Sequence, residues 1–515
     1  MKLFIQINMD VSEEQFTGVH LYALLVSFAL AAFLISLDGM IVNVAIPTIS
    51  GDLGVREDVG TWVITVFTMA NTLFIPVSNR LSLRFGDRAV FTYGLMIFCA
   101  GSVLCAFAYN FNLLLIFRVF QGAGAGLILP VSLSLIITHF PESKRAVAVG
   151  FWSFFAMVGP AMGPMVGGWL SAYNWHYLFI INLPICLAIL LVVYVILGPL
   201  KREKGEGFKD WVGLAALFLA MGTLQVALNR GQIRDWFRSD IIPILLIISV
   251  ISLVVFIVWE CYQKDPFLDL SHFKKRNFTL ACTCMGLAMG VIFSSFILDS
   301  LWVYNVLGYT PAWEGLTLAP VGIFPIILYP IVGRYVTIID VRIWVIGSFI
   351  LYACTFFWLS RLNVDASFFR VAFPRFIQGI GFPFFTIPCA MMVVRGIRKH
   401  ELTGVISFFS FMRMMGVAIM IPLITTLWIH RTAFYRSRTA EQTFATNPAF
   451  LDLVARFEEV AQSKYQALDM TNRYLVAQES TLGLCDIYYA FGWFFLALAI
   501  VPFFFKTAAR PPKNG

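Results

Sequence analysis

The feature that most limits what this chain can fold into is its series of long apolar runs. The 515-residue sequence holds fourteen, and most have about 20 residues or more. A helix of about 20 residues, rising about 1.5 Å per residue, crosses the ~30 Å hydrocarbon core of a bilayer. With 59% hydrophobic and 13% charged residues, the chain has more apolar surface than a soluble core of this size can bury. The sequence therefore predicts an all-α membrane protein with spans at about 19–46, 59–79, 89–108, 112–138, 146–170, 177–198, 211–229, 241–262, 278–307, 312–336, 341–360, 367–394, 402–428 and 484–505.

Two of these runs are nearly the same sequence. Arg118-Val-Phe-Gln-Gly-Ala-Gly returns 257 residues later as Arg375-Phe-Ile-Gln-Gly-Ile-Gly, and each copy is followed by a Pro. The loop 79–88 after the second span is likewise echoed by 333–342 after the tenth. Six spans repeat as six, the pattern of many secondary transporters. The predicted domains are an N-terminal six-helix bundle, two inserted helices with their linkers, and a C-terminal six-helix bundle, at 1–198, 199–270 and 271–515.

Basic residues are shared unevenly between alternate loops. One set of loops carries eighteen Lys and Arg residues, and the opposite short loops carry six. Because basic loops stay on the cytoplasmic side of a membrane, we expect an inner-membrane protein with both termini in the cytoplasm. The long polar segment 429–483 then lies outside, where Leu451–Ala467 can form an amphipathic helix. The net charge of +8 reflects this topology, so no nucleic-acid partner is predicted.

The sequence argues against several other classes of protein. The nine Cys residues lie in or beside apolar runs, and 429–483 contains none, so neither a disulfide framework nor a metal site nor a cofactor is predicted. No Gly-x-x-x-x-Gly-Lys-Ser/Thr motif occurs. We therefore do not expect an ATP-driven pump or another membrane enzyme.

Charged residues inside the apolar runs are the best candidates for function. A charged residue at the centre of a membrane costs at least about 2.5–3.5 kcal/mol, and such residues usually serve function. Asp38 lies nine residues before Pro47, and Arg118 lies about six residues past the start of a span that runs the other way. Both fall at similar depth, so they can meet. Asp299 and Arg375 offer a similar pair in the second half. The sequence distance between the two Asp residues differs from that between the two Arg residues by about one helical turn. The alternative is that such pairs only lock helices together.

Five motifs occur in an order that identifies a family. They lie at Leu37–Pro47, Arg118–Pro130, Gly159–Gly168, Trp175–Pro184 and Gly231–Phe237. Nearly the whole chain resembles the major facilitator superfamily, specifically the fourteen-span drug:proton antiporters of the EmrB/QacA kind. The resemblance implies a major facilitator fold with two six-helix repeat bundles plus two inserted central helices.

The resemblance also implies a function. It is proton-coupled antiport that exports amphipathic compounds, as in multidrug efflux, by alternating access. The implied partners are a small-molecule substrate, protons and the lipid bilayer, with a periplasmic adaptor and an outer-membrane channel as in relatives from Gram-negative cells. An alternative within exporters is an endogenous cargo such as a siderophore or a fatty acid.

Residue roles follow from the motifs and from the charges. The residues expected to couple protons are Asp38, Arg118 and Asp299. Those expected to bind substrate are Asp38, Asn43, Arg118, Gln121, Arg375 and Gln378. The antiporter motif of the fifth span is Gly159, Pro160, Gly163, Pro164, Gly167 and Gly168, in which the prolines bend the helix and the glycines give it a smooth face. The gating loops hold Arg80, Arg84, Gly86, Arg88, Gly333, Arg334 and Arg342.

This chain departs from the family pattern in the loop after the second span. Asn79 and Leu83 stand where the family normally has Gly and Asp. The family's charge relay at its inward gate is therefore lost unless Asp87 replaces it. A further charge, Arg413, lies in mid-span beside Met412 and Met414, where a structural contact is the favoured interpretation.

Overall fold

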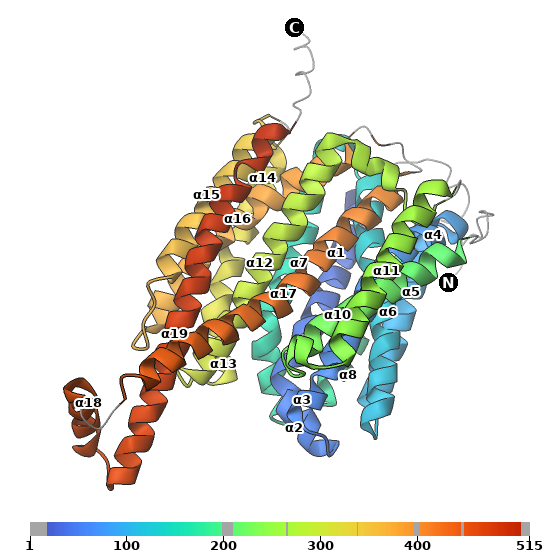
Figure 1. The fold of residues 1–515 in the computed structure, drawn as a ribbon. Helices are drawn as coiled ribbons and strands as arrows, with labels where there is room; N and C mark the ends of the chain where they lie inside the picture. The colour runs from blue at the N-terminus through green and yellow to red at the C-terminus, as the bar shows by residue number, and fades with distance from the viewer. Residues whose placement is uncertain are drawn as a thin grey trace.

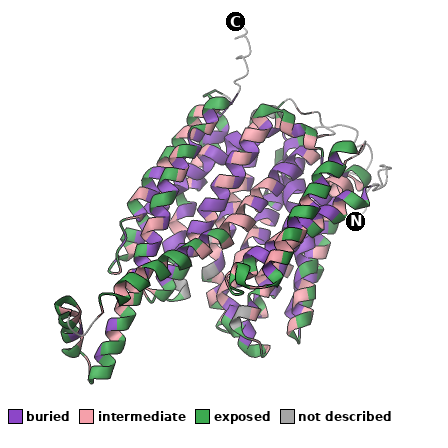
Figure 2. Cartoon of the chain, viewed as in Figure 1, coloured by how far each residue is buried: buried purple, intermediate pink, exposed green. Residues whose placement is uncertain are grey.

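The structure is a computed structural model that describes residues 18–197, 210–263, 266–336, 338–395, 397, 401–443 and 447–505. Over these residues it contains helices and no strands. The helices lie side by side in one bundle, with buried side chains toward the middle and exposed ones outside (Figure 1, Figure 2). The all-α prediction is confirmed.

The first six predicted spans form one side of the bundle. Their helices are α1 (Gly18–Ile41), α4 (Trp62–Phe85), α5 (Asp87–Ala106), α6 (Phe111–His139), α7 (Glu142–Ser171) and α9 (Asn182–Leu197). Short helices connect them at one end: η1 (Asn43–Ala45), α2 (Ile46–Asp52), α3 (Glu57–Gly60) and α8 (Tyr177–Ile180). Pro47 in the first turn of α2 lacks a backbone donor, so it is tolerated only where a helix starts. The first span therefore breaks where its motif ends.

The last six predicted spans form the other side. They comprise α12 (Arg276–Asn305), α13 (Pro311–Leu318), η4 (Ala319–Gly322), α14 (Ile323–Tyr335), α15 (Val341–Leu359), α16 (Phe368–Val394), α17 (Leu402–Ala440), α19 (Lys464–Leu498) and η6 (Val501–Phe504). The tenth span is split into α13, η4 and α14. Pro320 in the first turn of η4 marks this break.

The two inserted spans are α10 (Trp211–Gly231) and α11 (Ile241–Tyr262), with η2 (Trp236–Arg238) between them and η3 (Leu270–Lys274) after them. They pack against each other, and α10 also contacts α4 and α17. One side of α11 leaves Ile244, Ile247, Val250 and Val254 exposed. An apolar side chain exposed at this depth faces lipid, so α11 belongs to the membrane-facing surface.

Thirteen helices in the described residues are long and apolar enough to cross a membrane. A fourteenth is α7, whose parts Lys144–Pro160 and Met165–Ser171 meet at 45°. The prediction of about fourteen spans is therefore confirmed, and the chain is a multi-pass membrane protein. The domain boundaries at 198 and 270 stay a prediction.

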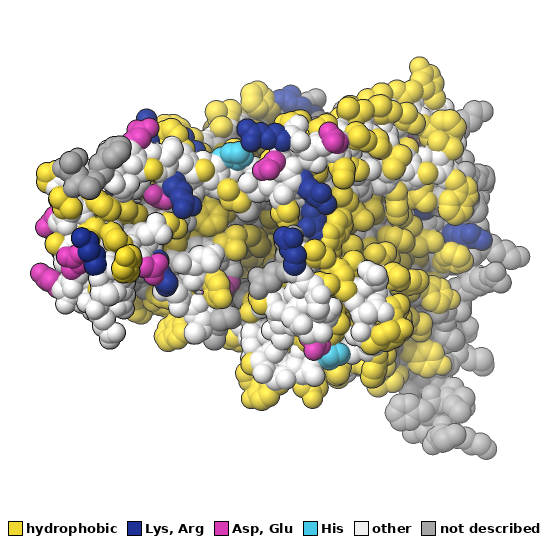
Figure 3. Space-filling view, turned by 60° about the horizontal axis from the view of Figure 1, so that its bottom comes forward, with side chains coloured by type: hydrophobic (Ala, Val, Ile, Leu, Met, Phe, Trp, Pro, Cys, Tyr) yellow, Lys and Arg dark blue, Asp and Glu magenta, His cyan; other side chains and the backbone are white. Residues whose placement is uncertain are grey.

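The segment 429–483 differs from expectation. It was predicted as a polar loop, but α17 continues to Ala440, α19 begins at Lys464, and α18 (Pro448–Glu458) lies between them. The amphipathic helix predicted over 451–467 is thus shorter and starts earlier. We call the described part of 429–483 the extension. It protrudes from the bundle, and side chains of both charges gather on its surface (Figure 1, Figure 3).

Contacts between α17 and α19 explain why the extension is helical. The Trp428 indole donates to the carbonyl of Ser480 at 3.0 Å, and the Arg431 guanidinium binds the Asp486 carboxylate at 2.5 Å. Tyr435 donates to the same carboxylate at 2.9 Å. The two helices therefore support each other beyond the apolar runs.

Two names are used for the ends of the bundle. The α18 end is the one that carries α18. The terminal end is the opposite one, where α1 begins and α19 ends (Figure 1).

Candidate functional site

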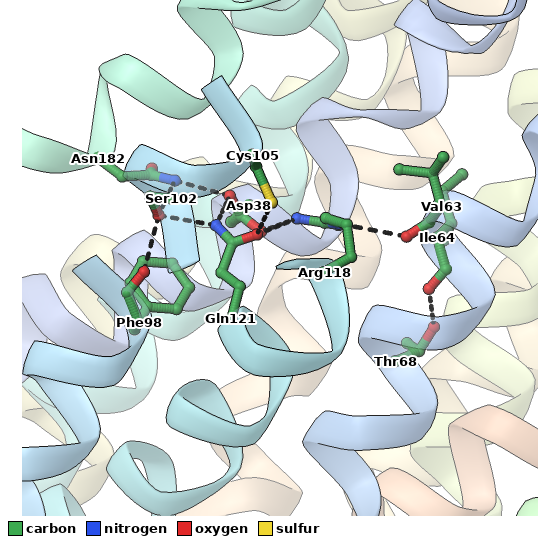
Figure 4. Close-up of polar contacts among 10 residues, drawn as sticks. All are labelled: Asp38, Val63, Ile64, Thr68, Phe98, Ser102, Cys105, Arg118, Gln121 and Asn182. Carbon is green, nitrogen blue, oxygen red and sulfur yellow. Dashed lines mark hydrogen bonds and ion pairs between the residues drawn. The ribbon is translucent and has the colours of Figure 1, made fainter. Parts of the chain in front are cut away.

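Asp38 and Arg118 form an ion pair inside the first half of the bundle. The Arg118 Nη1 lies 2.6 Å from the Asp38 Oδ2, and both side chains are fully buried. The other carboxylate oxygen accepts hydrogen bonds from Gln121 at 2.9 Å and from Asn182 at 2.7 Å. Ser102 accepts from both amides, at 2.8 and 3.2 Å (Figure 4). The predicted meeting of Asp38 with Arg118 is confirmed.

This first network joins helices that are distant in the sequence. Asp38 comes from α1, Arg118 and Gln121 from α6, and Asn182 from the start of α9. Arg118 also donates to the Val63 carbonyl of α4 at 3.2 Å and to Gln121 at 2.7 Å. A buried ion pair is stable only when hydrogen bonds satisfy its remaining polar atoms. The surrounding polar groups provide most of that compensation, and the Arg118 Nη2 and the Asn182 Oδ1 have no partner among the described residues.

Glycines allow the helices of this network to approach closely. A Cβ on Gly101 of α5 would lie 2.8 Å from the backbone of Gln121, and one on Gly122 would lie 2.5 Å from the Phe67 carbonyl of α4. The glycine run of α6 is therefore a packing surface, as small residues in membrane helices usually are. The short side chain of Asp38 reaches both Arg118 and Asn182 because the backbones are close.

A second network repeats this arrangement in the other half. Arg375 of α16 pairs with Asp299 of α12, and both side chains are fully buried. Arg375 donates to Gln378 at 2.6 Å and to Ser295 at 3.0 Å. Tyr488 of α19 donates to Asp299 and accepts from Arg375 at 3.2 Å. The expected second acid and base pair is present despite the difference in sequence offset.

The two networks share a plan. In each, an Arg binds a Gln three residues later on the same helix and an Asp on the first span of its half. The last span of each half adds one more polar group, Asn182 in the first and Tyr488 in the second. Sequence analysis missed both groups, because an amide or a phenol near an apolar run is a much weaker signal than a charge.

A cavity of about 350 Å³ lies between the two halves. Its walls come from both, with apolar side chains such as Met40, Met289 and Phe293 and polar ones such as Asn43. The inserted helix α10 adds Gln225 and Asn229. The inserted spans therefore form part of the cavity wall, which the sequence did not predict.

Most of the residues expected to bind substrate do not line this cavity. Of the six residues expected to bind substrate, Asn43 alone lines it. Asp38, Arg118, Gln121, Arg375 and Gln378 are fully buried and point toward neighbouring helices of their own half. Their charges pair with each other inside each half, away from the cavity wall. Gly39 and Met40, next to Asp38, do line it, so the first network lies directly behind the wall.

The glycines of the predicted antiporter motif lie against α1. A Cβ on Gly159 would lie 2.7 Å from the Phe33 carbonyl, one on Gly163 2.7 Å from the Met40 side chain, and one on Gly167 2.3 Å from the Ile41 carbonyl. These three glycines are four residues apart, so they share one face of α7. Together with the 45° bend after Pro160, they give the smooth, bent helix that the sequence predicted.

Polar contacts close the terminal end between the halves. Asp87 accepts from Ser134 of α6 at 2.8 Å and from Thr403 of α17 at 2.9 Å. Ser78 and Ser407 lie 2.6 Å apart across the same boundary. Asp87 thus joins α6 to α17 across this boundary through hydroxyl groups.

The gating-loop residues have mixed surroundings. Gly86 has φ 81° and separates α4 from α5, which suits glycine because other residues are strained there. Arg80 donates to the Phe267 carbonyl at 3.3 Å, and Arg342 donates to the Phe505 carbonyl. A Cβ on Gly333 would lie 2.8 Å from the Ala146 carbonyl of α7. Arg84 and Arg334 are exposed, and Arg88 is half-buried.

Comparison with known proteins decides the family. The sequence model of the Major Facilitator Superfamily matches residues 28–420, more than half of the chain. The chain belongs to the major facilitator superfamily. This major facilitator is 37% identical over 497 residues to the "Multidrug export protein EmrB" of Haemophilus influenzae, covering 96% of this chain and 97% of the relative. The predicted resemblance to EmrB-type antiporters is confirmed.

Two further proteins are similar to this major facilitator. The "Fatty acid resistance protein FarB" of Neisseria gonorrhoeae is 34% identical over 500 residues, which is 97% of this chain and 98% of that protein. The crystal structure of the human organic anion transporter MFSD10 has a TM-score of 0.59 at 12% identity, covering 92% of this chain and 99% of the other. The latter supports the fold alone.

Proposed function

We propose that this chain is a proton-coupled exporter of amphipathic compounds, of the multidrug efflux type, that works by alternating access. The names of its relatives favour drug export. The observation that carries the proposal is the first network, in which the fully buried Asp38 carboxylate is held by a cation directly behind the cavity wall. The antiporter face of α7, packed against the helix that carries Asp38, supports movement of that helix during transport.

We infer that Asp38 is the group that gains and releases the proton. Gain of a proton removes the charge that holds Arg118, so the bonds from α1 to α6 and α9 weaken together. Gly39 and Met40 follow Asp38 on α1 and line the cavity, so movement of α1 changes the cavity wall. Asp299 with Arg375 is the second candidate for coupling, because it repeats the same acid, base and amide in the other half.

The test is Asp38→Asn in proteoliposomes with an imposed pH gradient. We expect uphill accumulation of substrate and substrate-induced proton release to fall to background, while downhill exchange persists. Asp38→Glu keeps a carboxyl group and should restore part of the coupling. Asp486→Asn, in α19 next to the extension, is the matched control and should behave as wild type. Wild-type accumulation by Asp38→Asn would move coupling to Asp299.

The fold of the variant needs its own control, because removing one partner of a buried ion pair costs about 3–5 kcal/mol. Size-exclusion profiles and thermal melting check it. If Asp38→Asn does not fold, the double variant with Arg118→Gln removes both charges and leaves no unpaired cation. Uphill transport by that folded double variant would contradict the proposal equally well.

A second candidate function is export of an endogenous metabolite such as a fatty acid or a siderophore. The FarB relative, named for fatty acid resistance, favours this alternative. A panel of drugs, fatty acids and siderophores in the same proton-release assay separates the two.

The proposed location is the inner membrane, with both termini in the cytoplasm. The terminal end then faces the cytoplasm, and the extension faces the periplasm. A periplasmic adaptor and an outer-membrane channel complete the proposal, as the resemblance implies. Co-purification with the product of a neighbouring adaptor gene tests this partnership.

A further inference from the structure

Arg413 of α17 is the one residue among those lining the cavity that carries a charge. No Asp, Glu, Lys or His lines the cavity with it. The two other Arg residues buried in the halves, Arg118 and Arg375, are turned away from the cavity into ion pairs. The cavity therefore presents a single positive charge to whatever enters it.

Arg413 has no acidic partner. None of the ion pairs and side-chain hydrogen bonds in the described part of the chain includes it. Its Cζ lies 5.9 Å from the centroid of the Trp152 ring, and the Tyr329 phenol is close enough to interact with its charge. Trp152 is fixed in turn by donating its indole N–H to Ser132 at 3.0 Å. The guanidinium lies near this ring, and its donors make no hydrogen bond within the described residues.

Unused polar atoms occur elsewhere in the same wall. The Gln225 Nε2 and the Asn71 Oδ1 are buried without hydrogen-bond partners, and each residue is at most 3% exposed. Buried polar atoms normally have partners, and in the described part of the chain others without one occur in the two networks, at the Arg118 Nη2 and the Gln378 Nε2. Gln225 and Asn71 line the cavity with Arg413.

The rest of the wall suits an apolar body. Five methionines, Met40, Met157, Met285, Met289 and Met414, line the cavity with several phenylalanines. Methionine side chains are flexible and polarisable, so they adapt to apolar groups of different shape. The wall therefore sets few limits on the shape of the apolar part of the cargo. Arg413 determines which charge of the cargo is favoured.

We propose that Arg413 is the counter-ion of the cargo, and that the cavity takes amphipathic organic anions whose carboxylate or other oxyanion binds the guanidinium. Arginine stays protonated and matches a carboxylate with two parallel donors. A cationic cargo meets repulsion with no acid in the wall to offset it. This inference rests on the proposed export function, because it names the class of substrate for that cavity.

Three fluorescent ligands with one common body test the inference. Pyrenebutanoate is anionic, pyrenebutanol is neutral and pyrenebutyltrimethylammonium is cationic. Binding is measured by fluorescence on purified protein in detergent, for wild type, Arg413→Gln and Arg413→Lys. Arg456→Gln in α18, where an exposed i,i+4 ion pair is removed, is the matched control.

We expect wild type to bind the anion about tenfold or more tightly than the alcohol, as one charge-assisted pair allows. Arg413→Gln should abolish that preference and leave binding of the alcohol unchanged. Arg413→Lys should keep part of the preference, and Arg456→Gln all of it. Equal losses for all three ligands in Arg413→Gln mean a structural role and overturn the inference. So does a wild-type preference for the cation.

Transport assays separate this inference from the proposed function. Proton-driven export of pyrenebutyltrimethylammonium without any preference for the anion sinks the inference and leaves the exporter proposal intact. An Arg413-dependent preference for the anion, in a protein that exports none of the three ligands, sinks the exporter proposal and leaves the binding site intact.

Discussion

At the scale of the residue, Arg118, Arg375 and Arg413 differ in what neutralises their charges. Arg118 and Arg375 each have an Asp from the same half, so their charges are balanced in the folded protein. Arg413 has an aromatic ring instead. Balanced pairs suit a reversible change of protonation, and an unbalanced cation suits a ligand that arrives with the missing charge.

Changing Arg118 separates a coupling role from a scaffolding role. Arg118→Ala leaves the Asp38 carboxylate without its cation, so its proton-binding equilibrium changes. We expect transport to fall and its pH optimum to move. Arg118→Lys keeps the charge and should retain part of the activity, although one ammonium cannot reproduce bonds to Asp38, Gln121 and the Val63 carbonyl. The measurement is a pH profile of proton-driven uptake into inverted vesicles.

An unchanged pH optimum in Arg118→Ala, at reduced rate, would assign the pair to scaffolding. The control is Arg431→Ala, which removes an ion pair in the extension and should leave the pH profile as in wild type.

Sequence predicted the charged members of both networks and missed the neutral ones. Counting residues from the span ends placed Asp38 and Arg118 at the same depth. Because an unpaired charge inside a membrane is costly, opposite charges at one depth are expected to pair. Asn182 and Tyr488 gave no such signal, since polar residues near span ends commonly face water. Which side of a helix faces which neighbour depends on packing, so the cavity wall, including α10, could not be predicted either.

At the scale of the element, the contact between α7 and α1 depends on the absence of side chains. Gly167 is the strictest position, because its neighbour is a backbone carbonyl that cannot rotate away. Helices joined over such a face can slide and rock without changing side-chain packing.

Gly167→Ala should push α7 away from α1. The added methyl group would lie 2.3 Å from the Ile41 carbonyl, so the helices must separate. Overpacking of this kind costs about 1–3 kcal/mol, and we expect a lower melting temperature and slower transport. Gly222→Ala in α10 is the matched control, because nothing lies within 4 Å of its added methyl group. Equal melting temperatures for Gly167→Ala and wild type would contradict this account of the contact.

The extension shows why one element was predicted wrongly. Apolar runs end where the membrane ends, so reading for spans cuts α17 and α19 at that boundary. Helix–helix packing does not stop there, as the bonds of Arg431 and Tyr435 to Asp486 demonstrate. A polar composition alone does not distinguish a loop from a helix that continues into water.

At the scale of the whole molecule, the halves contact each other at the terminal end through Asp87 and Thr403, and through Ser78 and Ser407. These are hydroxyl contacts, which are weaker than ion pairs and suit a boundary that opens in each cycle. The cavity lies between these contacts and the α18 end.

Topology can be tested by cysteine labelling in intact cells. Ala449→Cys, two residues after Asn447 in the exposed first turn of α18, should react with a membrane-impermeant maleimide added outside. The native Cys261, exposed near the end of α11, should react only after permeabilisation. Protection of Ala449→Cys in intact cells would reverse the proposed orientation or change the count of spans.

The length of α17 has a mechanical consequence. Its 39 residues extend about 58 Å at 1.5 Å per residue. Near one end of this helix Thr403 donates to Asp87, part-way along it Arg413 lines the cavity, and nearer the other end Arg431 pairs with Asp486 of α19. Pro422 lies between Arg413 and Arg431 and gives the helix a point at which to flex. One helix therefore joins the protruding extension to the contact between Thr403 and Asp87, past the wall of the cavity.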